Sequence, residues 1–82
     1  MKQFSAKITV RLKNGVLDPQ GKAIEGALSS LGFEGVNQVR QGKTFDVELE
    51  ASSKKDAEAA LAEMCEKLLA NMVIEDYAVE LN

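Results

Sequence analysis

The sequence contains no histidine and no tryptophan, and it has a single cysteine, Cys65, among 82 residues. One cysteine cannot form a disulfide within the chain. A zinc site built from cysteine and histidine needs more ligands than the sequence has. A cysteine nucleophile needs a base or a lowered pKa. Because no histidine is available and Cys65 lies on the apolar face of a predicted helix, we expect this side chain to fill the core.

Long apolar runs and an excess of basic residues are missing as well. No stretch approaches the roughly 18–20 apolar residues of a membrane span, and residues 1–7 lack the apolar run of a signal peptide. Lysine and arginine total 10 against 13 aspartates and glutamates, so the net charge is −3 and no clustered basic face is expected. The lone cysteine fits a reducing compartment. These features predict a cytoplasmic protein that binds neither membranes nor nucleic acids.

A chain of this length has room for one domain, which we place over residues 1–82. Such a domain buries only about 60–65% of the surface that its unfolded chain exposes, and one core of that size rarely supplies more than ~3–5 kcal/mol. Disulfides, metals or association usually stabilise small domains further. Because the first two are excluded here, we expect the chain to associate with copies of itself or with a larger partner.

The first third of the chain predicts a strand followed by a helix. Apolar and polar side chains alternate over residues 4–12, which is the period of a half-buried strand. Asp18 and Pro19 then suit the N-cap and first position of a helix. One apolar stripe follows, made of Ala23, Ile24, Ala27, Leu28 and Leu31. Gly32 suits the left-handed position after the helix, while Gly26 in its middle costs about 1 kcal/mol and suggests close approach of a strand or another chain.

Residues 36–51 are predicted to be extended, with Phe45, Val47 and Leu49 on one face. Two arrangements fit this pattern. Gln41–Gly42 can form the two-residue turn of a hairpin, or the glycine can mark a bulge within one long, bent strand. A long strand would extend beyond its own domain and pair with the sheet edge of another chain.

The last third predicts a second helix and a final strand. Ser53–Asp56 resembles a capping box with aspartate in place of the usual glutamate. The apolar stripe of the helix that follows consists of Ala57, Ala60, Leu61, Met64, Cys65, Leu68 and Met72. The segment 73–81 places Tyr77, Val79 and Leu81 on one face.

The predicted order of elements is therefore β-α-β-α-β, in which the second strand is long and bent or forms a hairpin. Each helix has one apolar stripe and each strand has one apolar face. The fold class that buries all of them is α+β, a two-layer, ferredoxin-like sandwich with an antiparallel sheet and both helices on one face. The other face of the sheet is expected to be polar or to meet a partner.

Two short motifs suggest chemistry, but their context argues against it. Gly42-Lys43-Thr44 matches the end of a P-loop, yet Asn37 stands where the first glycine is needed, and a strand follows where a helix is required. Residues 40–45 loosely resemble an RNA-contacting strand. Phe45, however, shares its face with core residues, and the acidic side chains on the other face would repel nucleic acid. The other carboxylates are predicted to be solvated.

Gly15–Ile24 is the segment most specific to a known family. It contains Val-Leu-Asp-Pro-Gln-Gly, and Leu31–Phe33 supplies Leu-Gly-Phe a fixed distance later. Together with Val39–Lys43 and residues 71–75, these segments resemble the PurS family over essentially the whole chain. Met72 is a departure, because the family commonly has proline after the asparagine at position 71.

The resemblance implies a role in de novo purine biosynthesis. PurS proteins are small subunits of phosphoribosylformylglycinamidine synthase, an amidoligase that converts formylglycinamide ribonucleotide to formylglycinamidine ribonucleotide. A glutaminase subunit releases ammonia, and a large synthetase subunit binds ATP and the ribonucleotide. The small subunits form homodimers or dimers of dimers that bridge the two and assist ammonia transfer. We therefore expect no catalytic, cofactor or metal site in this chain, because ATP, Mg²⁺ and glutamine belong to the other subunits.

Six residues are candidates for contact with a partner: Val16, Leu17, Gln20, Arg40, Gly42 and Lys43. Val16 and Leu17 are apolar residues in a loop, so they either cover an edge of the core or touch a partner. Arg40 and Lys43 have no evident local structural requirement, which makes them the preferred candidates. The alternative function is a small-molecule-sensing regulatory domain of the ferredoxin-like kind, which also associates through sheet edges.

Overall fold

The computed structural model describes all residues from Met1 to Asn82. The elements in chain order are β1 (Lys2–Leu12), α1 (Pro19–Ser30), β2 (Gly42–Ala51), α2 (Lys54–Met64), its continuation η1 (Cys65–Leu69) and β3 (Glu75–Leu81). The predicted α+β class and the order β-α-β-α-β are confirmed. None of the helices is long and apolar enough to cross a bilayer.

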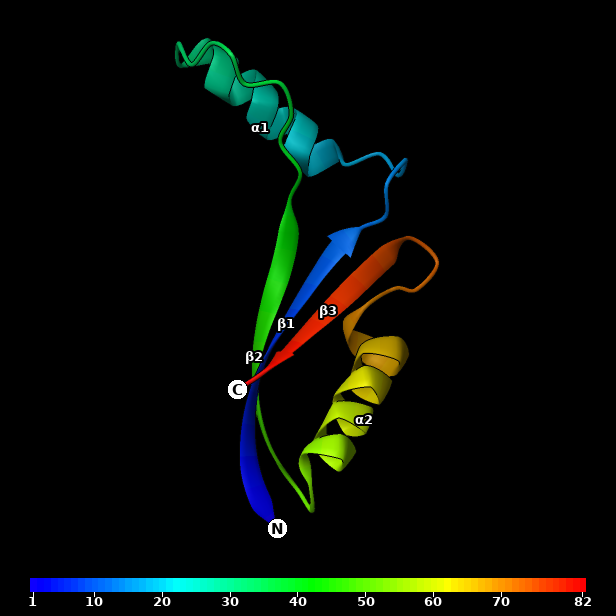
Figure 1. Ribbon diagram of the computed structural model, residues 1–82. Helices are drawn as coiled ribbons and strands as arrows, with labels where there is room; N and C mark the ends of the chain where they lie inside the picture. The colour runs from blue at the N-terminus through cyan, green and yellow to red at the C-terminus, as the bar shows by residue number, and fades with distance from the viewer.

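The three strands form one antiparallel sheet in which β1 lies between β2 and β3 (Figure 1). β2 follows β1 along almost its whole length, whereas β3 covers only Ala6–Leu12. Residues 36–51 form neither a hairpin nor one long strand, because β2 begins at Gly42 and residues 36–41 belong to no strand. The reason is that two backbone N–H groups of this segment bond to side chains of α1, namely its N-cap Asp18 and Glu25 in its middle.

The core lies between the sheet and α2, where the alternation along β1 places it. Ala6, Ile8 and Val10 are buried and pack against Leu61 and Cys65. Half-buried apolar side chains of β2 and β3 surround this cluster, including Phe45, Val47, Leu49, Tyr77 and Val79. Burial raises the pKa of the Cys65 thiol, so the residue is an inert part of the core, as the sequence predicted.

Both helices begin at the predicted caps. Asp18 is the N-cap of α1, and the Ser53 hydroxyl accepts a hydrogen bond from the Asp56 N–H at the start of α2. α1 ends in a Schellman motif: Gly32 has φ +93°, and the N–H groups of Gly32 and Phe33 donate to carbonyls in the last turn. Local sequence therefore fixes where these helices start and where α1 stops.

The second helix ends earlier than its apolar stripe predicted. After Met64 the chain widens into a π-helical turn, in which the Ala70 N–H donates to the Cys65 carbonyl at 2.9 Å. Ala70 is extended, and the Asn71 side chain accepts a hydrogen bond from the Val73 N–H. Met72 therefore lies in the turn before β3 and not on the helix, because the Asn71 side chain replaces the next helical hydrogen bond.

The placement of α1 differs from the expected two-layer sandwich. Only α2 covers the sheet, whereas α1 projects away from it and makes no extensive contact with the sheet or with α2 (Figure 1). The molecule measures 52 × 24 × 15 Å, and its radius of gyration is 16.5 Å. A compact domain of this length would have a radius of gyration of about 12 Å. The prediction that both helices lie on one face was wrong within the single chain, because periodicity identifies an apolar stripe but not what covers it.

Candidate functional site

The six candidate residues gather where α1 joins the sheet. We call residues 19–38, which are α1 and the segment that follows it, the arm. Two chain segments connect the arm to the sheet, residues 13–18 leading out and residues 39–41 leading back, and we call them the neck. The candidates lie on the neck, in the first turn of α1 or at the start of β2. The structure therefore brings together residues that are more than 20 positions apart in the sequence.

Asp18 is the central side chain of the neck. It exposes only 7% of its surface, and its two carboxylate oxygens accept hydrogen bonds from the Gly21 N–H at 2.9 Å and the Gln41 N–H at 2.7 Å. These two bonds, helped by the nearby Arg40 guanidinium, hold the pKa of Asp18 below its usual value, although burial opposes them. Sequence reasoning identified Asp18 only as a helix cap, but it also binds the segment returning to β2.

Arg40 makes a second link across the neck, in the opposite direction. Its Nη2 donates to the carbonyl oxygens of Leu12 and Lys13, both at 3.2 Å. These carbonyls lie where β1 ends and the chain turns toward the arm. The sequence shows no local structural requirement for Arg40, and the structure adds a non-local one, because its acceptors are backbone groups 27 and 28 residues away.

Gly21 is a structurally required residue that sequence reasoning did not interpret. A Cβ atom at this position would overlap the Val39 carbonyl oxygen and would lie 2.8 Å from Asp18 Oδ2. Glycine therefore allows the first turn of α1 to touch the returning segment. The signal was present in the sequence, because a glycine two residues after the helix-starting Pro19 is costly in a helix unless close approach requires it. A Cβ atom at Gly26, by contrast, would have no neighbouring atom within 4 Å, so no close approach within the chain explains that glycine.

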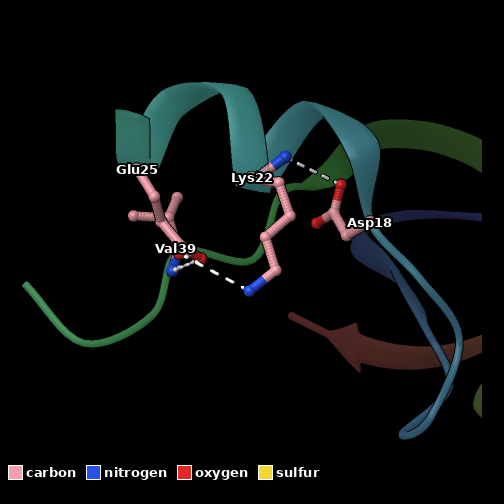
Figure 2. A network of polar contacts seen from close by, with 5 residues as sticks. Asp18, Lys22, Glu25 and Val39 are labelled. Carbon is pink, nitrogen blue, oxygen red and sulfur yellow. Dashed lines mark hydrogen bonds and ion pairs between the residues drawn. The ribbon is translucent and has the colours of Figure 1, made fainter. Parts of the chain in front are cut away.

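Further polar contacts bind the returning segment to α1. Glu25 accepts a hydrogen bond from the Val39 N–H at 2.9 Å and pairs with the Lys22 ammonium at 3.6 Å (Figure 2). At the first turn, the Gln41 side-chain amide donates to the Gln20 side-chain oxygen. The candidate Gln20 is thus partly occupied by a contact within the chain. Together these contacts explain why residues 39–41 follow the helix and do not extend β2.

The other candidates lie around the neck with different exposures. Leu17 exposes 69% of its surface, whereas Val16 is half-buried. Gly42 opens β2, and a Cβ there would lie 2.8 Å from the Val10 carbonyl oxygen, so it too has a steric role. Lys43 is exposed, with its ammonium 5.9 Å from the centre of the Phe45 ring. Leu17 and Lys43 remain the candidates that are most free to contact a partner.

The neck is bordered by open cavities whose lining residues are mainly polar. Three open cavities of about 370, 470 and 390 Å³ surround it, lined mainly by side chains of the neck and of the adjoining strand ends. No buried side-chain nitrogen or oxygen lacks a hydrogen-bond partner, and no group of three or more potential metal ligands is present. Gly42-Lys43-Thr44 lies in strand β2 and does not open a helix, so it cannot form a P-loop. The arrangement is suited to holding the arm and presenting a surface.

A second exposed region lies at the far end of α2. Its large apolar side chains are Met64, Leu68, Met72, Val73 and Ile74, of which Leu68 and Val73 are more than four-fifths exposed. An apolar groove of about 510 Å³ runs beside them, lined by Val47, Ala60, Met64, Leu68 and Leu69, with Glu63 and Lys67 at its edge. Neither this groove nor the arm is covered within the chain.

A family model described as "PurS: Phosphoribosylformylglycinamidine (FGAM) synthase" matches residues 5–82. The chain belongs to the PurS family. The PurS subunit of Archaeoglobus fulgidus is 49% identical over 74 residues, which covers 90% of this chain and 92% of that protein. The PurS subunit of Bacillus subtilis is 48% identical over 77 residues, which covers 94% and 90%.

Solved PurS structures share the same fold. PurS of Bacillus subtilis superimposes with a TM-score of 0.88 at 47% identity, covering 96% of this chain and 98% of that one. A chain from the structure of PurLQS of Thermotoga maritima gives a TM-score of 0.90 at 35% identity, with 100% of both chains covered. The projecting arm is therefore compatible with the architecture of PurS proteins over the full length of the chain.

Proposed function

We propose that this chain is the non-catalytic subunit that bridges the glutaminase and synthetase subunits of phosphoribosylformylglycinamidine synthase and assists ammonia transfer between them. The observation that carries the proposal is the full-length similarity to a chain of the PurLQS structure, with a TM-score of 0.90. In this proposal ATP, Mg²⁺ and glutamine are used by the other subunits, and the complex works in the cytoplasm. The chain contributes surfaces and not reacting groups.

The amount of exposed surface supports a role in assembly. The accessible surface of the chain is 5961 Å². A compact monomer of 8.9 kDa would expose about 4,800 Å², so the chain exposes roughly 1,100 Å² more than its size requires. A standard protein interface buries about 800 Å² on each partner. The excess is therefore of the size that one interface removes.

The partner that best accounts for this excess is a second copy of the chain. The neck exposes Leu17, and the arm exposes Ile24, Leu31, Phe33 and Val36. The sheet layer lacks the helix that would lie beside α2. In a homodimer, the apolar stripe of α1 from one copy would lie against the groove between β2 and α2 of the other. Each sheet would then have two helices, as the sandwich predicted from the sequence requires. Two such dimers can associate further through the remaining surface.

In this proposal the chain assists ammonia transfer by holding the other two subunits in fixed positions. Ammonia is nucleophilic only while it is unprotonated, and release into water at neutral pH converts most of it to ammonium. A dimer that holds the outlet of the glutaminase against the inlet of the synthetase delivers ammonia before this happens. Fixing the two subunits replaces a diffusive encounter with a positioned one.

The test is turnover of formylglycinamide ribonucleotide by the synthetase and glutaminase subunits, with and without this chain. We expect the chain to restore glutamine-dependent turnover and to affect the ammonia-dependent reaction much less. If neither reaction responds to the chain, the bridging function is wrong and a small-molecule-sensing role becomes the better explanation. A thermal shift with amino acids and nucleotides would test that role.

The homodimer is tested separately by sedimentation of single variants. Leu31→Glu on the arm and Leu68→Glu beside the groove should each shift the chain toward the monomer. Ser29→Glu is the matched control, because it adds the same charge to α1 away from the apolar stripe. A dimer that is unchanged by both leucine variants would contradict this mode of association.

A further inference from the structure

Two charged side chains, one from each segment of the neck, hydrogen-bond to the backbone of the opposite segment or to the strand end beside it. Asp18, on the outgoing segment, binds the Gln41 N–H of the returning segment at 2.7 Å. Arg40, on the returning segment, binds the carbonyls of Leu12 and Lys13, where the outgoing segment begins, at 3.2 Å. All of these bonds involve a charged side chain and a backbone group, a combination that is stronger than a neutral hydrogen bond.

Without these links, the neck would be a natural hinge. Residues 13–18 and 39–41 belong to no helix or strand, and the arm that they carry makes no extensive contact with the sheet. Two irregular segments joining two structured parts normally allow bending by changes in a few backbone angles. The bonds of Asp18 and Arg40 remove this freedom, because both join the two segments, one at the start of α1 and the other at the end of β1. Gly21 contributes by letting the returning segment lie against the first turn of α1.

We propose that Asp18 and Arg40 are positioning residues that fix the direction in which the α1 arm leaves the sheet. The arm and the sheet then move as one body before any partner binds. The direction is set by side chains from both segments and not by packing of α1 on its own chain. A partner that contacts both the arm and the sheet meets a surface that is already arranged, which reduces the ordering cost of binding. The inference concerns the isolated chain and holds whether or not the chain bridges other subunits.

The experiment measures the distance between two spin labels within one chain, on Ser29→Cys in the arm and Glu50→Cys on the exposed face of β2, with Cys65→Ala throughout. All variants also contain Leu31→Glu, so that no second copy holds the arm, and labelled chain is diluted into unlabelled chain. We expect one narrow distance distribution in this reference. Asp18→Asn and Arg40→Met should each broaden the distribution, and the double variant should broaden it further.

The controls distinguish a change in the direction of the arm from a loss of its folded structure. Asp46→Asn removes the same charge from the exposed face of β2 and should leave the distribution narrow. Arg40→Met keeps the Asp18 cap and the apolar stem of the side chain, so α1 should keep its circular dichroism signal. In the same chains, the Gln41 amide should exchange with solvent roughly tenfold faster in Asp18→Asn, the size expected for loss of a charge-assisted hydrogen bond. Distributions that stay narrow in Asp18→Asn, Arg40→Met and the double variant would overturn the proposal.

Discussion

The two helices of this chain have similar apolar stripes, but they bury them very differently. α2 and its continuation η1 pack on the sheet, where Ala57, Leu61 and Cys65 are completely buried. α1 buries only Gly21, and Leu31 at its end exposes 73% of its surface. The sheet and α2, which we call the body, bury the core side chains between them. The arm, by contrast, is stabilised mainly by its caps and by polar links at its base. A helix can therefore be well formed while its apolar face stays uncovered within its own chain.

The largest expected effect contrasts a leucine of the body with a leucine of the arm. Leu61→Ala should lower the free energy of unfolding by about 2–5 kcal/mol, because it leaves a cavity in the core. Leu31→Ala, the same change on an exposed side chain, should change it by about 0.5 kcal/mol or less while the chain is monomeric. Urea unfolding at low protein concentration measures both. Equal losses would show that the arm is packed within its own chain.

The two glycines of α1 sharpen the contrast between the base of the arm and its middle. Gly21→Ala should destabilise the chain by about 1–3 kcal/mol, because the methyl group collides with the Val39 carbonyl and with Asp18. Gly26→Ala meets no atom within 4 Å and should stabilise the helix by about 0.5–1 kcal/mol. Thermal unfolding of the two variants is the measurement. A stabilising Gly21→Ala would mean that the returning segment does not lie against α1.

Two glutamates allow a further comparison. Glu25→Gln should cost about 1 kcal/mol, because the neutral amide oxygen accepts the Val39 N–H more weakly than the carboxylate does and the ion pair with Lys22 is lost. Glu63→Gln, on the body, breaks only an exposed ion pair with Lys67 and should cost about 0.5 kcal/mol or less. Denaturant unfolding at low and high salt measures both, and the small effect at Glu63 should diminish in salt. A larger loss at Glu63 than at Glu25 would contradict the link between α1 and the returning segment.

The smallest effect near neutral pH is the pH dependence of Asp18. Its pKa in the folded chain is lowered by the Gly21 and Gln41 N–H groups, so its charged form stabilises the fold. This stabilisation is present above the unfolded pKa of about 3.9 and is lost as the pH falls through the folded pKa. The difference in unfolding free energy between the wild type and Asp18→Asn should therefore be constant near pH 7 and should shrink in acid. A difference that stays the same from pH 7 to pH 3 would mean that the Asp18 carboxylate is not held by these bonds.

Much of the candidate site could be located from the sequence, but the role of its residues could not. The motif from Val16 to Gly21 and the pair Arg40 and Lys43 do meet at one place in the structure. Arg40 was expected to be free for a partner, and Gly21 was not interpreted. Both interact with groups 18 to 28 residues away, such as the Val39 and Leu12 carbonyls. No periodic pattern in a single sequence reports such pairs.

By itself, the sequence determined the family, the elements and their faces. The alternation along β1, the caps at Asp18 and Ser53 and the stop at Gly32 follow from contacts within a few residues, which local sequence specifies. Only the tertiary structure decided where β2 begins, which helix covers the sheet and how the arm is held. These features depend on long-range hydrogen bonds between the neck segments. They also depend on which surface buries each apolar stripe, and the stripe itself does not specify that surface.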